Sequence, residues 1–174
     1  MDFDMDFDRG AGTFSPSSRS MASLTCLASK GAGSEDEGMK IDGNCHCGAI
    51  AYEAELDPAR VRLCHCTDCQ SLSGTAFRIT APVREADFRL LRGEPKIYIK
   101  TAQSGRKRIQ AFCGDCGSPI YATKPEGEGD RTFGIRAGTI RQRLELTPRR
   151  QYWRASALPW VPPMECLETF DGDG

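Results

Sequence analysis

The spacing of the cysteines constrains this chain more than any other feature. Seven of its nine cysteines lie between positions 45 and 116. They form three short clusters, which read Asn44-Cys45-His46-Cys47-Gly48, Cys64-His65-Cys66-Thr67-Asp68-Cys69 and Phe112-Cys113-Gly114-Asp115-Cys116-Gly117. Cysteines two or three positions apart on a tight turn can direct two sulfurs at one point, and zinc holds thiolates in a tetrahedron at about 2.3 Å. We therefore predict that these segments bind metal.

Disulfides account for the same spacings less well, because the number of cysteines is odd and the sequence carries no secretory signal. Two turns with two cysteines each would complete one four-ligand site, which leaves a set of three. Spacing alone leaves two interpretations of the second set. It is either a catalytic site with an open fourth position or a closed structural site completed by His46, His65 or Cys166. His65 is a poor ligand here, since its side chain points away from both neighbouring sulfurs in an extended segment.

The chain divides into a tail and one domain. Residues 1–38 begin with a duplicated Met-Asp-Phe-Asp and continue through Ser/Gly-rich sequence into an acidic triplet. We predict that this N-terminal tail is disordered, because it offers too little apolar surface for a packed core. Residues 39–174 form the predicted domain. The reduced cysteines favour a cytoplasmic location.

The domain is predicted to be mainly β, because short β-branched and aromatic runs alternate with Gly and Pro turns. The predicted strands are Ala49–Ala54, Thr75–Ala81, Phe88–Leu91, Lys96–Lys100, Arg108–Phe112, Ile120–Thr123, Thr132–Ala137 and Gln151–Trp153. A single short helix is expected, either at Pro58–Leu63 or at Asp68–Ser73.

Charge and hydropathy exclude two classes of partner. The formal net charge is −1, which argues against binding nucleic acid through a strong basic field. The mean hydropathy is −0.45, and no apolar run approaches the ~20 residues of a membrane span.

Taken together, the clusters resemble those of the glutathione-dependent formaldehyde-activating enzyme family, whose domain also occurs in centromere protein V. The motifs are G-x-C-x-C-G, then C-H-C-x-x-C-Q followed by Ser73-Gly74, then F-C-x-x-C-G-S. Gly93, Tyr98 and Pro159-Trp160 match as well. The resemblance extends from about Met39 to the C-terminus. Gln151 departs from it, because many members have histidine at this position.

The resemblance implies a small zinc-binding domain of coiled β-sheets with two zinc ions per chain. It assigns Cys45, Cys47, Cys113 and Cys116 to a structural site. It assigns Cys64, Cys66 and Cys69 to a catalytic site whose fourth ligand is water or the substrate thiol. The implied activity is that of a carbon–sulfur lyase or synthase that handles a thiol–aldehyde adduct of the S-hydroxymethylglutathione type. Its substrates would be a small thiol such as glutathione and an aldehyde such as formaldehyde.

A glutathione pocket should present cationic donors, because glutathione carries two carboxylates. The candidates are Arg78, Arg106, Lys107, Arg108, Arg136 and Arg154, and the competing interpretation of each is a solvated surface base. Tyr98 and Trp160 either line the pocket or belong to the core. His46, His65 and Asp68 are candidates for groups beside the metal. The alternative function is a non-enzymatic zinc-stabilised β-module that binds a protein partner.

Overall fold

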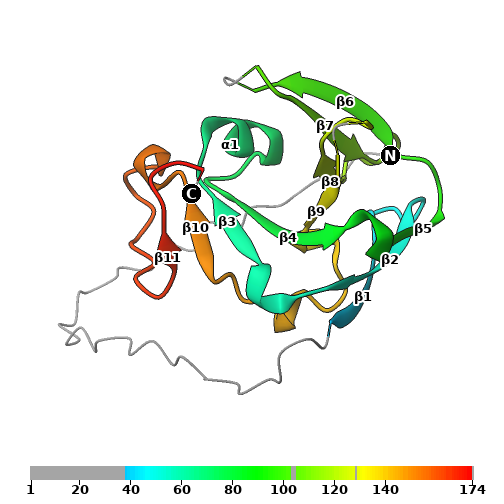
Figure 1. The fold of residues 1–174 in the computed structure, drawn as a ribbon, viewed down its shortest axis with the longest axis horizontal. Helices are drawn as coiled ribbons and strands as arrows, with labels where there is room; N and C mark the ends of the chain where they lie inside the picture. Colours follow the sequence, from blue (N-terminus) through cyan, green and yellow to red (C-terminus); the bar gives the residue numbers. More distant parts are fainter. Residues whose placement is uncertain (1–37, 103–104, 128, 174) are drawn as a thin grey trace, which may run out of the picture.

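The computed structural model describes residues 38–102, 105–127 and 129–173, and these residues form two β-sheets (Figure 1). The smaller sheet has the order β1-β2-β5, with β1 at Met39–Asn44, β2 at Ala51–Leu56 and β5 at Phe88–Arg92. The larger sheet has the order β11-β10-β3-β4-β9-β8-β7-β6. Its strands are β3 (Arg62–Cys64), β4 (Arg78–Arg84), β6 (Lys96–Thr101), β7 (Lys107–Phe112), β8 (Pro119–Thr123), β9 (Thr132–Arg136), β10 (Arg150–Tyr152) and β11 (Glu168–Thr169).

Helical structure is sparse in the described residues. The one α-helix, α1, spans Thr67–Ser73 and follows β3 almost directly. Short 3-10 turns lie at Pro58–Arg60, Glu85–Asp87, Ala137–Thr139, Arg143–Glu145 and Arg154–Ser156. None of the described helices is long and apolar enough to span a membrane. The mainly β class predicted from the sequence is therefore confirmed.

All eight predicted strands overlap observed ones, but their ends differ and three strands were missed. The predicted strand Thr75–Ala81 is β4, which starts at Arg78 and continues through Pro82 to Arg84. Proline is tolerated there because β3 pairs with β4 only as far as Thr80, so the Pro82 nitrogen has no ladder partner on that side. The missed strands are β1, β3 and β11, whose sequences carry few of the residues typical of strands.

Of the two helix predictions, Asp68–Ser73 is confirmed by α1. The prediction at Pro58–Leu63 is wrong, because only Pro58–Arg60 is helical, as a single 3-10 turn, and Arg62–Cys64 is a strand that pairs with β4 and β10. The tail predicted over residues 1–38 lies outside the described residues except for Gly38.

One face of the large sheet packs against the small sheet and forms the core. Four aromatic side chains meet between the sheets, with ring centroids 5.0 Å apart for Phe88 and Phe133 and 4.7 Å apart for Tyr121 and Phe133. Tyr52 is fully buried and lies 5.6 Å from Phe88. This face buries the apolar residues, which leaves the other face of the large sheet for different chemistry.

The opposite face of the large sheet carries a polar row. Directly paired residues on antiparallel strands point to the same face. The pairs Tyr98–Gln110, Gln110–Ala122 and Ala122–Gly134 therefore define one row across β6, β7, β8 and β9. Arg136 follows two residues after Gly134 and pairs with Thr80, and Arg78 pairs with Cys64. Cationic, amide and thiol side chains from distant parts of the chain thus share this face.

A substitution at Gly43 would test how closely the small sheet packs against the rest of the chain. A Cβ at this position would lie 2.3 Å from the Tyr52 hydroxyl oxygen and 2.4 Å from the Thr139 carbonyl oxygen. We expect Gly43→Ala to lower the free energy of unfolding by about 1–3 kcal/mol, because backbone on one side cannot yield. Urea unfolding measures the loss. Gly138→Ala is the matched control, since nothing lies within 4 Å of its Cβ position. Equal stability of the two variants would contradict the packing described here.

Candidate metal centres and the adjoining cavity

The first and third cysteine clusters form two turns with similar backbone hydrogen bonds. In the β1–β2 turn, the Cys45 N–H donates to the Ile50 carbonyl at 3.1 Å and the Gly48 N–H donates to the Cys45 carbonyl at 3.0 Å. In the β7–β8 turn, Cys113 donates to Ser118 and Gly117 donates to Cys113, both at 2.9 Å. Gly48 and Gly117 have φ values of 78° and 72°, which explains the glycine that follows each pair.

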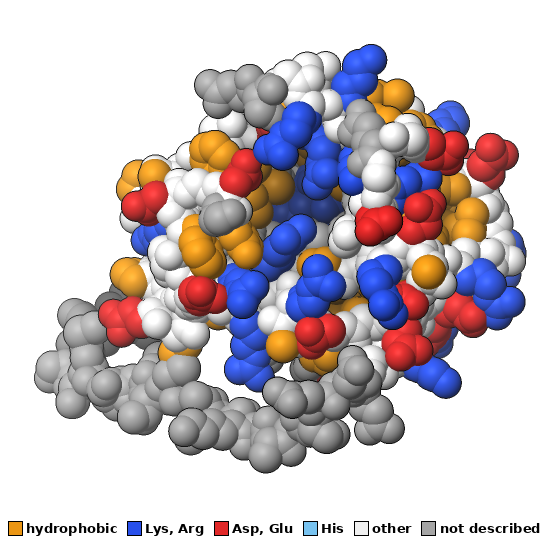
Figure 2. Space-filling model, in the orientation of Figure 1, with side chains coloured by type: hydrophobic (Ala, Val, Ile, Leu, Met, Phe, Trp, Pro, Cys, Tyr) orange, Lys and Arg blue, Asp and Glu red, His pale blue; other side chains and the backbone are white. Residues whose placement is uncertain are grey.

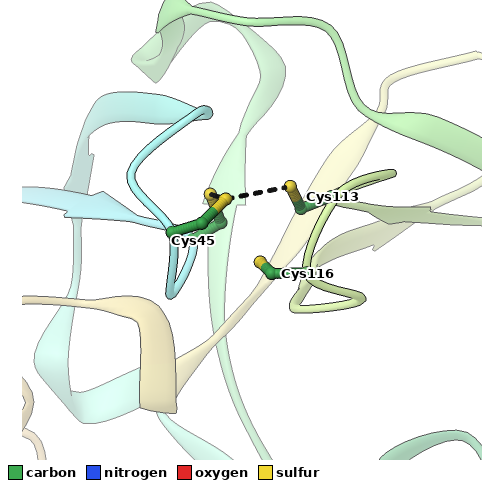
Figure 3. Close-up of side chains that lie close together, drawn as sticks. Cys45, Cys113 and Cys116 are labelled. Carbon is green, nitrogen blue, oxygen red and sulfur yellow. Dashed lines mark hydrogen bonds between the residues drawn. The ribbon is translucent and has the colours of Figure 1, made fainter. Parts of the chain in front are cut away.

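These two turns bring four sulfurs together, as Figure 3 shows for Cys45, Cys113 and Cys116. The four ligand atoms lie within 4.8 Å of one another. The Cys45–Cys47 sulfur distance is 3.5 Å and the Cys47–Cys113 distance is 3.7 Å. Tetrahedral coordination with bonds of about 2.3 Å places sulfurs about 3.8 Å apart, so the spacing fits zinc.

Backbone and hydroxyl donors support this cluster from outside. The Ile50 N–H donates to the Cys45 sulfur at 3.2 Å, and the Ser118 hydroxyl lies 3.2 Å from the Cys116 sulfur. The Ser118 contact, together with backbone hydrogen bonds, lowers the pKa of Cys116 to about 5. Such donors favour the thiolate, which is the form that binds metal.

The second cluster is local and is built around the start of α1. Cys64 ends β3, Cys66 is the N-cap residue of α1, and Cys69 lies in the first turn. Their three sulfurs lie within 4.8 Å of one another. The Cys69 N–H donates to the Cys66 sulfur at 3.4 Å. Hydrogen bonds from Cys64 and Cys69 hold the pKa of Cys66 well below its usual value, and the Lys100 charge adds to this effect.

His65 is not part of the three-sulfur group. Its side chain is fully buried, with Nε2 3.1 Å from Gln151 Oε1 and the ring edge-on to Phe77. This agrees with the expectation that it points away from its neighbours. Gln151, which the sequence marked only as a departure, therefore fixes the histidine, and its own Nε2 donates to the Thr169 hydroxyl at 2.8 Å. His46 is exposed on the other turn.

The structure separates the candidate cations into two groups. Arg78 and Arg136 are only 6% and 7% exposed, so the surface-base interpretation is wrong for both. Arg106, Lys107 and Arg108 are exposed, and Arg154 is half-buried. Asp68 forms an ion pair with Lys100, a residue that sequence reasoning missed.

A cavity of about 380 Å³ lies between α1 and the polar face of the large sheet. Its lining includes Tyr98 but not Trp160, which is 71% exposed elsewhere. A second cavity of about 180 Å³ adjoins it and shares Leu72 and Tyr98. Figure 2 shows Lys and Arg side chains gathered in and around a hollow on this face. The first cavity is lined by Leu72, Arg78, Tyr98, Gln110, Ala111, Phe112, Gly117 and Pro119. The second is lined by Leu72 and Tyr98 together with Asp68, Ser71, Lys100 and Thr101.

Fold and site together define a β-rich protein with two thiolate clusters suited to metal and a partly cationic cavity beside one of them. The sequence model for the glutathione-dependent formaldehyde-activating enzyme family matches residues 40–156. The chain belongs to this family, which supports a role in the glutathione-dependent activation of formaldehyde.

Other comparisons add little to this assignment. No curated protein matched the chain. Among solved structures, a Rhodobacter sphaeroides protein from a structural genomics programme is 22% identical with a TM-score of 0.46. That match covers 74% of this chain and 98% of the other.

The two clusters are expected to differ in what they do for stability. Cys113→Ser should give largely unfolded or insoluble protein, because its cluster joins positions 66 residues apart and structural zinc contributes about 10 kcal/mol in small zinc peptides. Cys66→Ser should stay folded and bind one zinc ion less, because its cluster spans a single turn. Elemental analysis and urea unfolding measure both effects. Equal destabilisation by the two substitutions would contradict this division.

Proposed function

We propose that this protein is a zinc-dependent carbon–sulfur lyase or synthase that interconverts a thiol, an aldehyde and their adduct. In the forward direction the thiol sulfur bonds to the aldehyde carbon, the C=O π bond becomes a C–O single bond, and the thiol proton goes to that oxygen. Glutathione and formaldehyde are the proposed substrates, and S-hydroxymethylglutathione is the product. The observation that carries the proposal is the three-cysteine cluster together with a cavity of about 380 Å³ whose lining includes Arg78, the strand partner of Cys64.

Two zinc ions per chain are part of the proposal. Cys45, Cys47, Cys113 and Cys116 would hold the structural ion, and Cys64, Cys66 and Cys69 would hold the catalytic one. The sulfur spacing and the donor hydrogen bonds of both clusters suit thiolate coordination. Zinc with three protein ligands can supply thiolate stabilisation at neutral pH and carbonyl polarisation. A cytoplasmic location, where thiols stay reduced and able to bind metal, is also part of the proposal.

The protein's own residues prepare this site by balancing charge. Three thiolates around a divalent cation carry a formal charge of −1, and a substrate thiolate would add another. Lys100 and Arg78 supply positive charge next to the cluster. Lys100 forms an ion pair with Asp68 in the first turn of α1, and Arg78 pairs with Cys64 across β4 and β3. Leu72 and Tyr98 line both cavities and give them an apolar wall.

A partner-binding role is the second candidate, and one observation favours it. Strand β6 ends the large sheet and exposes Ile97, Tyr98 and Ile99 to between 49% and 53%. An exposed apolar edge strand offers unpaired backbone groups to another protein. A zinc-stabilised module without catalytic activity would use this edge.

Cobalt substitution tests the first proposal. In the cobalt protein, glutathione should shift the visible d–d bands and add sulfur-to-cobalt charge-transfer intensity. The zinc protein should then accelerate exchange among formaldehyde, glutathione and the hydroxymethyl thioether, measured by exchange NMR at equilibrium because the reaction also proceeds without enzyme. Cys66→Ser is the control for both measurements.

The outcomes separate the candidate functions. A cobalt spectrum that no thiol changes would mean that the cluster is closed, which favours the partner-binding role. Thiol binding without faster exchange would retain the site but reject formaldehyde as its substrate.

A further inference from the structure

Two buried guanidinium groups lie on the polar face without an acidic partner. Arg78 on β4 and Arg136 on β9 are only 6% and 7% exposed. Neither forms an ion pair with a carboxylate among the described residues, whereas eight such pairs occur elsewhere in the same residues. The Nε atoms of both are buried without a hydrogen-bond partner. Buried charge is costly unless it is paired, so this arrangement calls for an anion.

Gln110 connects the two arginines. Its Oε1 accepts from Arg136 Nη2 at 2.7 Å and from Arg78 Nη1 at 3.4 Å. Because both guanidiniums can only donate, the amide is oriented with its oxygen toward them and its Nε2 as a remaining donor. Gln110 and Arg78 both line the larger cavity. Arg136 does not line it and acts by positioning Gln110.

Small neighbours make room for these long side chains. In the row across the sheet, Ala122 on β8 follows Gln110, and Gly134 on β9 lies two residues before Arg136. A Cβ on Gly134 would approach the Thr80 side chain to 2.8 Å. Thr80 Oγ1 in turn accepts from Arg136 Nη1 at 3.4 Å. The two arginine side chains are therefore held in place by hydrogen bonds to Thr80 and Gln110.

We propose that Arg78 and Gln110, positioned by Arg136, form a carboxylate-recognition site in the floor of the cavity. The site selects substrates that carry a carboxylate and places it on the face that also holds Cys64. This inference rests on the proposed function, since it names a substrate class for the same cavity. The carboxylate belongs either to the thiol, as in a peptide thiol, or to the aldehyde, as in an oxo acid.

The thiolate cluster is the competing explanation for the unpaired charges. Cys69 and Arg78 interact electrostatically, and Cys69 also acts on Arg136. If the arginines served only to balance the thiolates, removing their charge would weaken the binding of every thiol alike. If they recognise a carboxylate, only carboxylate-bearing ligands would lose affinity. The two explanations therefore predict different patterns.

The experiment compares 3-mercaptopropionate with 3-mercapto-1-propanol by titrating the cobalt protein. Arg78→Gln should reduce the preference for the carboxylate roughly tenfold or more, as expected for loss of a charged hydrogen bond. Gln110→Glu should abolish the preference as well, because it supplies an internal carboxylate to both guanidiniums. The same variant should raise the melting temperature. Arg89→Gln, whose side chain is exposed on β5 and paired with Glu53, is the control.

A second measurement needs no cobalt, and its first step needs no thiol. In the zinc protein, the 15N–1H signals of the Arg78 and Arg136 Nε groups should shift on addition of propionate or glyoxylate, and not with acetaldehyde. A larger response to glyoxylate than to 3-mercaptopropionate would assign the carboxylate to the aldehyde, and the reverse would assign it to the thiol.

The inference is overturned if the carboxylate preference survives both substitutions and no arginine signal moves. An equal loss for both thiols in Arg78→Gln would also overturn it, in favour of charge balance. If no thiol changes the cobalt spectrum, the proposed function fails, but the propionate shifts still decide whether the carboxylate site exists.

Discussion

The contact between the Cys47 and Cys113 sulfurs is the constraint on which the rest of the structure depends. It joins two turns 66 residues apart, one from each sheet. Four sulfurs within 4.8 Å would repel one another as thiolates, so a cation is the natural partner of this arrangement. Once the turns are joined, the aromatic residues Phe88 and Phe133 can stack between the sheets. The four-cysteine cluster thus joins the two sheets at one end, and the aromatic side chains fill the space between them.

This fastening divides the large sheet into two faces with separate tasks. One face is used for packing, with Ala81, Ala111 and Ile135 almost completely buried. The other carries the polar row, the end of β3 and the cavity under α1. Because the cysteines of the second cluster lie within one short segment, they add chemistry to this face without holding the fold together. Stability and reactivity are thereby assigned to different cysteines.

The sequence predicted the parts of this design that depend on local spacing. It identified the three cysteine clusters, the strands rich in β-branched residues and, as one of two alternatives, the helix after Cys66. The division of the cysteines into two groups came from the family resemblance. It could not predict which arginines are buried, because Arg78 and Arg136 become neighbours only through the pairing of β4 with β9. Gln110 was missed for the same reason, since its role depends on strand register. Strand β1 was missed because Asp42, Gly43 and Asn44 are poor strand formers that pairing with β2 overrides.

Strand β7 serves both faces through the simple alternation of its side chains. Gln110 and Phe112 line the cavity, whereas Cys113 is buried in the core between the sheets. Ala111 is almost completely buried and borders the cavity as well. A one-residue slip in a strand moves every side chain to the opposite face. An insertion or deletion in β7 would therefore disturb the cavity and the joined turns at once. The length of this strand is therefore constrained twice, by the cavity that it lines and by the cysteine turn that follows it.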